Sequence, residues 1–248
     1  MIETDEKLRN AAKGIQRRQT EGIFMEQIKQ NCRKLYYKYG HIWVFLYILI
    51  YMPWFMWLEQ TVTTSYYVIH SPFDDYIPFC EYFVVPYLLW FPFIACTLLY
   101  FFFTDKKGFY QVSAYLFTGM TIFLIISTIF PNGLQLRPRV FERDNIFVAM
   151  VRLIYMADTP TNVLPSLHVY NSLAAFAALS SSGRFVTEHK KLHRFCLVLT
   201  VSIVLSTMFL KQHSVVDVIA GCVMAYIIYQ FVYVPGTGKS PNLARQTT

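Results

Sequence analysis

The sequence has little charge and few cysteines, and each shortage excludes a class of protein. Of its 248 residues, 15% are Asp, Glu, Lys or Arg, whereas 55% are hydrophobic. This composition is too apolar for an ordinary soluble domain. The cysteines form no C-x-x-C pair and mostly lie in or near apolar blocks, so we expect small apolar fillers rather than redox or metal-binding residues. The five are Cys32, Cys80, Cys96, Cys196 and Cys222.

Two further signals are missing from the chain. No nucleic-acid-binding motif accompanies the formal net charge of +7, so we expect no nucleic-acid partner. The first 40 residues contain no early apolar stretch, so we expect no cleavable signal peptide, and the first span would serve as the insertion signal.

Six apolar blocks are present, and they approach the length of about 20 residues that crosses the hydrocarbon core of a bilayer. The fourth block has low hydropathy, with polar residues among alanines, and we expect it to be buried inside a bundle rather than exposed to lipid. The sequence therefore predicts an all-α polytopic membrane protein, a six-transmembrane-helix bundle. The blocks cover residues 42–58, 83–103, 111–130, 164–182, 195–210 and 215–234.

We divide the chain into a basic N-terminal segment (1–40), a six-span membrane domain (41–235) and a flexible tail (236–248) rich in small and polar residues. In the first segment, apolar residues between 8 and 15 repeat at helical spacing among basic residues. This pattern fits either an interfacial helix or a solvated tail that only anchors topology.

Lysine and arginine gather in the segments that six spans would place on one side of the membrane. By the positive-inside rule, both termini are expected in the cytoplasm, and we expect the membrane to be a plasma membrane. Two groups of basic residues lie on the predicted outer side instead, and an anionic substrate held there is one explanation. They are Lys211 and a loop with Arg137, Arg139, Arg143 and Arg152.

A histidine and an aspartate lie four positions apart at the start of the last block. On a helix this spacing would stack His213 and Asp217 on one face, within hydrogen-bonding reach. A carboxylate that fixes the tautomer of an imidazole leaves its other lone pair free, as a histidine nucleophile requires. The alternative is a structural pair that ties two helices together.

His168 is about one turn into the fourth block, at a depth that should match that of His213. Facing the first histidine, it could protonate a leaving oxygen and then deprotonate water; a structural histidine is the alternative. Pro165 and Ser166 are predicted to open that helix, so its free N–H groups and the Ser166 hydroxyl would cradle phosphate. Arg137 would add a bidentate fork and Lys211 a point charge, although each cation alone also fits a headgroup contact or a solvated charge.

At these residues the sequence resembles the type 2 phosphatidic acid phosphatase superfamily, marked by K-x6-R-P, P-S-G-H and S-R-x5-H-x3-D. The chain matches with Arg137-Pro138, with Pro165-Ser166-Leu167-His168, and with Ser206, His213 and Asp217. It departs at Phe130 and Thr207, where the family has lysine and arginine, and at Leu167, where it has glycine.

The resemblance implies catalysis by His213 as nucleophile, Asp217 as its orienting partner and His168 as acid and base. Arg137, Ser166 and Lys211 would hold the phosphoryl oxygens, and Arg139 or Arg143 could replace a missing cation. No metal or other cofactor is implied. We favour a lipid phosphate or pyrophosphate phosphatase with its site at the outer face. The alternatives are a lipid headgroup phosphotransferase with an alcohol acceptor, as the altered motifs suggest, and a transporter or binding protein on the same scaffold.

Overall fold

The structure is a computed structural model that describes residues 25–31 and 33–234. It divides into two compact units, residues 1–46 and 47–248. In the described part of the first unit, residues 25–31 and 33–39 are helical, and the 3-10 helix η1 (Gly40–Tyr47) begins there. The repeat predicted between residues 8 and 15 and the tail 236–248 lie outside the described residues.

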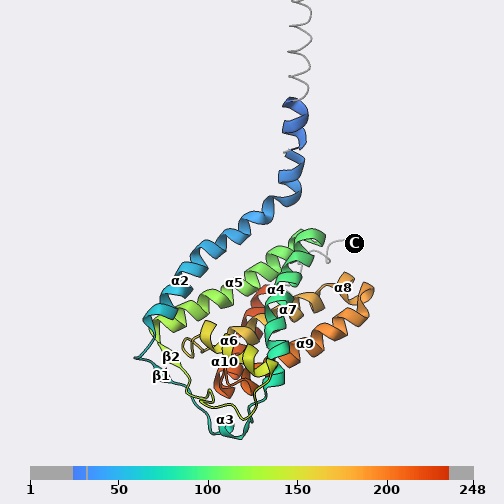
Figure 1. Cartoon of the computed structure of the whole chain (residues 1–248). Helices are drawn as coiled ribbons and strands as arrows, with labels where there is room; N and C mark the ends of the chain where they lie inside the picture. The colour runs from blue at the N-terminus through green and yellow to red at the C-terminus, as the bar shows by residue number, and fades with distance from the viewer. Residues whose placement is uncertain (1–24, 32, 235–248) are drawn as a thin grey trace, which may run out of the picture. The chain divides into compact units, whose positions relative to one another are not determined.

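The second unit is a bundle of helices (Figure 1). Its long helices match the predicted blocks in order, although α5 and α9 each begin five residues before the block that predicted them, because their first turns carry charged residues. They are α2 (Ile48–Thr61), α4 (Val84–Thr104), α5 (Lys106–Ile129), α7 (Leu167–Ser181), α9 (Lys190–Phe209) and α10 (Val215–Val232). In the described part of the chain, five helices are long and apolar enough to cross a membrane: Met25–Thr61, Glu81–Thr104, Lys106–Ile129, Lys190–Phe209 and Val215–Val232. The chain is therefore compatible with an integral membrane protein.

Helix α7 is the centre of the bundle, and its burial was expected from its small residues. It packs against α4, α5, α9 and α10, and its alanines Ala174, Ala175 and Ala178 are almost completely buried. Gly119 of α5 allows the closest approach, because a Cβ atom there would lie 2.1 Å from the Tyr170 ring of α7. The hydroxyl of Tyr170 donates to the Tyr115 carbonyl. This packing holds α7 rigidly between its neighbours.

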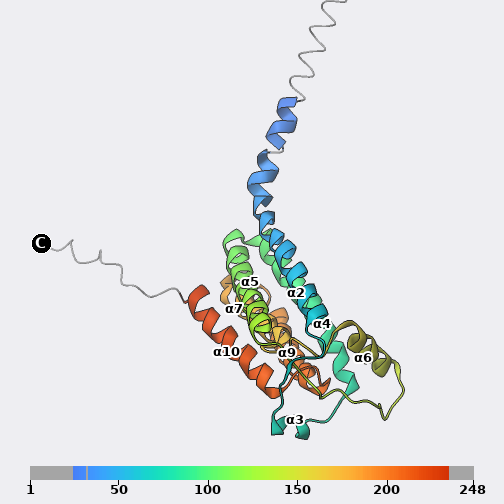
Figure 2. The same cartoon turned by 90° about the vertical axis from the view of Figure 1, so that its left-hand side faces the viewer.

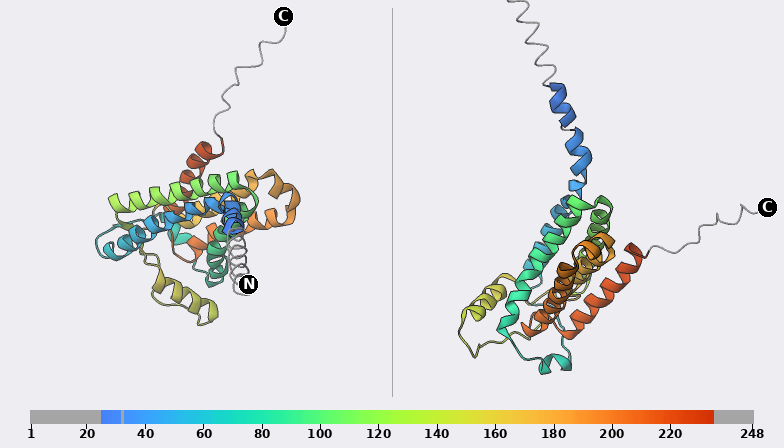
Figure 3. Two further views of the ribbon diagram at one scale, coloured as in Figure 1. Left: turned by 90° about the horizontal axis from the view of Figure 1, so that it is seen from above. Right: turned by 90° about the vertical axis from the view of Figure 1, so that its right-hand side faces the viewer.

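The loops predicted on the outer side meet at one end of the bundle. They carry β1 (Tyr67–Val68), α3 (Pro72–Tyr76), the 3-10 helix η2 (Glu81–Phe83), β2 (Asn132–Gly133) and α6 (Ile146–Ala157). The strands β1 and β2 pair in parallel and join two of these loops. The buried Glu81 side chain also connects the same two loops, since it accepts hydrogen bonds from Arg143 and Asn145. Arg152, which the sequence placed in a loop, instead lies in α6, a short helix that flanks this end (Figures 2 and 3).

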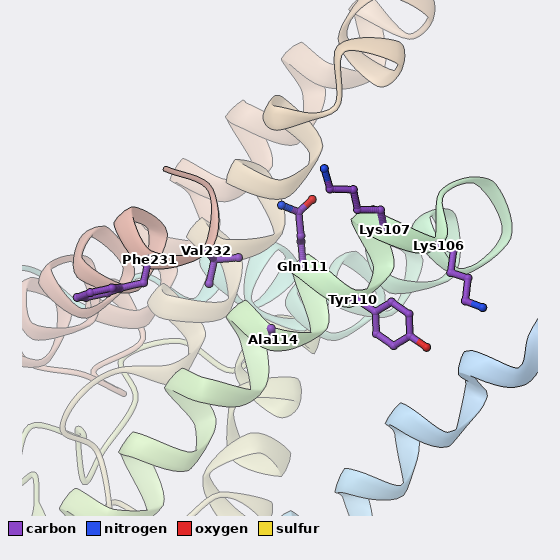
Figure 4. A pocket seen from close by; sticks show the side chains of 7 residues that line it. All are labelled: Lys106, Lys107, Tyr110, Gln111, Ala114, Phe231 and Val232. Carbon is purple, nitrogen blue, oxygen red and sulfur yellow. The ribbon is translucent and has the colours of Figure 1, made fainter. Parts of the chain in front are cut away.

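The opposite end of the bundle carries α8 (Gly183–Glu188) and the turn between α4 and α5. An open depression lies here between the start of α5 and the end of α10. Lys106 and Lys107 line it on one side, and Phe231 and Val232 on the other (Figure 4). The two ends of the bundle therefore differ, because one carries the loops and the other carries the lysines.

Candidate active site

The histidines His168 and His213 face one another at the loop-bearing end. His168 is the second residue of α7, which begins after the N-cap Ser166 because the Ser166 Oγ accepts from the Val169 N–H at 3.4 Å. His213 lies in the link between α9 and α10. Its Nε2 atom is 3.4 Å from Nδ1 of His168, and the ring centroids are 5.6 Å apart. The structure therefore brings the two rings together, as the sequence predicted.

Asp217 lies beside the other nitrogen of His213, although not through the geometry that the spacing predicted. Helix α10 begins only at Val215, so His213 precedes the helix and the two residues do not stack on one helical face. Instead, Ser214 is the N-cap of a capping box in which the Asp217 Oδ2 accepts from the Ser214 N–H at 2.8 Å. The same oxygen is 3.5 Å from Nδ1 of His213, and this nitrogen makes no hydrogen bond in the described part of the chain. Asp217 is completely buried, so its carboxylate faces the ring from inside the protein.

Helices α7 and α10 approach closely at this point. The Ser166 N–H donates to the Asp217 carbonyl at 3.1 Å, which joins the starts of the two helices. Gly221, one turn further along α10, permits the contact, because a Cβ atom there would lie 2.9 Å from the Ser166 carbonyl oxygen. Both histidines are therefore fixed to helices that are joined to each other.

Two aromatic rings from α4, which the sequence analysis did not single out, enclose His168. Tyr87 stacks on its imidazole with centroids 4.6 Å apart, and the Trp90 ring centroid lies at 4.4 Å. These residues are three apart, so they lie on one face of α4. In the sequence both residues belong to an apolar block. Only the polar atoms of a phenol and an indole near its outer end set them apart from the other residues of that block.

Arg137 contacts Gln212, the residue before His213, and its two terminal nitrogens donate to protein acceptors. Its Nη1 donates to the carbonyls of Tyr155 and Asp158, at 3.2 and 2.8 Å, and its Nη2 donates to the Gln212 Oε1 at 2.5 Å. Burial lowers the pKa of Arg137, and Asp158 opposes that effect. Two buried donors in this cluster, Nε of Arg137 and Nε2 of Gln212, have no acceptor in the described part of the chain. Such donors suit an anion.

The other two predicted cations lie elsewhere. Lys211 has a left-handed backbone, with φ of 53°, in the tight turn after α9. Its Nζ donates to the Asp74 carbonyl at 2.7 Å, so it faces the first outer loop. Burial lowers the pKa of Lys211, and Asp74 and Asp75 oppose that effect. Arg139 is exposed on the second outer loop.

Sequence reasoning missed two acidic residues around the site. The Asp74 carboxylate accepts from the Ser214 hydroxyl at 2.6 Å and from the Val215 N–H at 2.8 Å, and thereby supports the start of α10. Asp158 accepts from the Tyr87 hydroxyl at 3.2 Å. Burial raises the pKa of Asp158, whereas Arg137 and then His213 oppose that rise. Asp74 lies in the short helix α3 and Asp158 directly follows α6, in segments with no periodic pattern, so only the folded chain brings them here.

In residues 25–31 and 33–234, no group of three or more His, Cys, Asp or Glu side chains is arranged to hold a metal ion. His189 and His193, which are also four apart, lie at the other end of the bundle, where His193 contacts Ser180 and the Phe176 ring.

Comparison with known families agrees with the geometry of this site. The model of the PAP2 superfamily matches residues 112–236, just over half of the chain, from α5 through α10. The match includes both histidines, Asp217 and Arg137. No curated protein and no solved structure matches. The chain belongs to the PAP2 superfamily.

Proposed function

We propose that this protein is a membrane-embedded lipid phosphate phosphatase that works through a phosphohistidine on His213. Members of the superfamily are phosphatases or phosphotransferases, which makes enzymatic activity plausible. The observation that carries the proposal is the pair of imidazoles 3.4 Å apart, one of which has a buried carboxylate 3.5 Å from its other nitrogen. A nucleophile, its orienting group and an acid–base partner are the three parts that this chemistry needs.

In the proposed reaction, Nε2 of His213 attacks phosphorus and the bond from phosphorus to the lipid alcohol breaks. His168 gives the leaving alkoxide its proton. His168 then takes a proton from a water molecule, which attacks the phosphohistidine. Inorganic phosphate leaves, and His213 is restored. Because the attacking and leaving atoms lie roughly in line, the two rings must separate as the phosphoryl group enters between them.

The phosphoryl oxygens would meet the two buried donors that lack protein acceptors, Nε of Arg137 and Nε2 of Gln212. The free N–H groups at the start of α7, with the Ser166 hydroxyl, add further donors. In this proposal Gln212 joins the predicted set of phosphate ligands. Lys211 would have to leave the Asp74 carbonyl to reach phosphate, so we assign Lys211 and exposed Arg139 to attraction of the anionic headgroup.

We propose that the chain crosses a plasma membrane six times, and that α7 is a crossing in addition to the long apolar helices. Its 15 residues span only about 22 Å. Because four helices surround it, its length need not match the thickness of the lipid hydrocarbon core. Lys106 and Lys107 mark the opposite end of the bundle from the histidines, which supports an extracytoplasmic site and cytoplasmic termini.

The test is phosphate release from phosphatidic acid by the purified protein in detergent. His213→Ala should abolish turnover, whereas His193→Ala, a histidine at the other end of the bundle, should leave it intact. Unchanged turnover in His213→Ala would refute the nucleophile.

A phosphotransferase is the second candidate, because Phe130 and Thr207 stand where the phosphatase motifs have cations. Thr207 is buried, and its carbonyl accepts from the backbone of Gln212 and His213, so it shapes the turn rather than binding substrate. A transferase should release little phosphate until an alcohol acceptor is added. The same assay with and without glycerol or inositol distinguishes the two.

A further inference from the structure

An apolar cavity lies between α4, α7, α8 and α9, and the mechanism above does not use it. Its volume is about 310 Å³, which is at the small end for ligand pockets. Its lining is mostly apolar and carries two hydroxyls, those of Thr97 and Tyr100, besides two thiols. The Thr97 hydroxyl donates to the Phe93 carbonyl within α4. A pocket without charged groups and with so few polar ones suits a hydrocarbon and not a headgroup.

The cavity lies on the same side of α7 as the histidine pair. His168, Ser172, Ala175 and Leu179 follow one another at helical spacing, so they share one face of α7. Leu179 lines the cavity, and it is eleven residues beyond His168. At the rise of an α-helix this places it roughly 16 Å deeper in the bundle.

Helix α4 makes the same connection along the other wall. Leu89, Phe93, Cys96 and Tyr100 recur at helical spacing and line the cavity along its length. Leu89 is next in sequence to Trp90, whose ring contacts the His168 imidazole, so it lies at nearly the same height along α4. The cavity therefore begins near the height of the site and continues toward the opposite end of the bundle, in the direction that the tail of a lipid must take when its phosphate is at the histidines.

We propose that this cavity receives a single hydrocarbon tail of the substrate and selects lipid phosphates with a long chain. This inference rests on the proposed function, and it adds a determinant of chain length that is separate from the reacting groups. A short alkyl phosphate could reach the histidines without entering the cavity, whereas a long one would gain the burial of its methylene groups.

The experiment compares hexadecyl phosphate with butyl phosphate as substrates. Cys96→Phe and Leu199→Trp should fill the cavity and lower kcat/KM for hexadecyl phosphate about tenfold or more, since pocket contacts of this kind discriminate by that order. Hydrolysis of butyl phosphate should be unchanged. Cys222→Phe is the matched control, because Cys222 is an exposed cysteine of α10 that does not line the cavity. It should leave both substrates unaffected.

A second measurement does not depend on turnover. Hexadecyl phosphate should protect the Cys96 thiol from N-ethylmaleimide in the native protein, with modification read at each cysteine by mass spectrometry, whereas Cys222 should react as before. Protection of Cys96 without hydrolysis would support the tail site while refuting the proposed function. Hydrolysis with no protection of Cys96, and equal loss for both substrates in the filled variants, would overturn the tail site alone.

Discussion

The Oδ2 atom of Asp74 accepts a hydrogen bond of 2.6 Å from the hydroxyl of Ser214, 140 positions later in the chain. The same carboxylate accepts from the backbone N–H groups of Ser71 and Val215, so its two oxygens serve three donors. Asp74 is almost completely buried. The first outer loop is thus fastened to the start of α10, directly after the proposed nucleophile.

Asp74→Asn should weaken this connection. Whichever way the amide is turned, its NH2 group would meet a backbone N–H, of Ser71 or of Val215, and leave it without an acceptor. An unsatisfied buried donor costs about 1–3 kcal/mol, and thermal unfolding in detergent should show the loss. Turnover should also fall, by as much as about 10²-fold, because a small displacement of His213 is sufficient for that.

Asp75→Asn is the control for this change. Asp75 is the neighbouring residue, but its carboxylate is exposed and contacts only the exposed His70 side chain among the ion pairs described. It should behave as the native protein does. Equal stability and turnover in the two variants would show that Asp74 does not support the site.

Gly221→Ala should separate α10 from α7. The new Cβ atom would lie 2.9 Å from the Ser166 carbonyl oxygen, which is backbone and cannot swing aside. We expect a loss of stability of about 1–3 kcal/mol, typical of overpacking, together with reduced turnover, because Ser166 and Asp217 are joined at this contact. Thermal unfolding and phosphate release would be measured on the same preparation.

Gly183→Ala provides the comparison. A Cβ atom at Gly183, in α8, meets nothing within 4 Å, so its stability should stay within about 0.5 kcal/mol of the native value or rise slightly. If both glycine variants behaved alike, the close approach of α7 and α10 would not matter to the site.

The helices and the histidine pair could be predicted because each depends on local pattern. Apolar blocks give the long helices, Pro165 and Ser166 mark the start of α7, and the sidedness of the blocks brings His168 and His213 to one end. The loops could not be predicted in this way. Helix α6 is too short to stand out as a span, and the pairing of Tyr67 with Asn132 joins loops with no shared pattern.

The role of a polar residue in such loops depends on tertiary contacts. Lys211 was predicted to bind phosphate from its position between two spans, but the left-handed turn aims its ammonium at Asp74. The sequence did not single out Gln212, although its side-chain oxygen accepts a hydrogen bond from the Arg137 guanidinium. Asp158 would have been rejected for a phosphate site on its charge alone.

Asp158 should give the protein a pH-dependent stability. Burial raises its pKa above the ordinary value of 3.8, so the folded state binds this proton more tightly than the unfolded state does. The resulting contribution to stability is complete below pH 3.8 and is lost as the pH rises through the folded pKa. Asp158→Asn, which still accepts from Tyr87, removes that loss, and its melting temperature relative to the native protein should increase with pH above 3.8.

The measurement is thermal unfolding of both proteins in detergent across acidic and neutral pH. Asp144→Asn, an exposed carboxylate of the same outer loop, should follow the native curve throughout. A difference between Asp158→Asn and the native protein that stayed constant with pH would contradict the prediction.

The two histidines should fail in different ways if they divide the chemistry as proposed. His213→Ala removes the atom that bonds to phosphorus, so no phosphoenzyme can form from any substrate. His168→Ala removes the acid and base, which commonly contribute about 10²–10⁴-fold each. With p-nitrophenyl phosphate, whose leaving group needs no proton, His168→Ala should still phosphorylate His213 and then stall, because no base activates water.

Rapid quenching with 32P-labelled substrate should therefore find acid-labile label on His168→Ala and none on His213→Ala. Label on both variants would place the nucleophile elsewhere, and label on neither would mean that His168 acts before the phosphoenzyme forms.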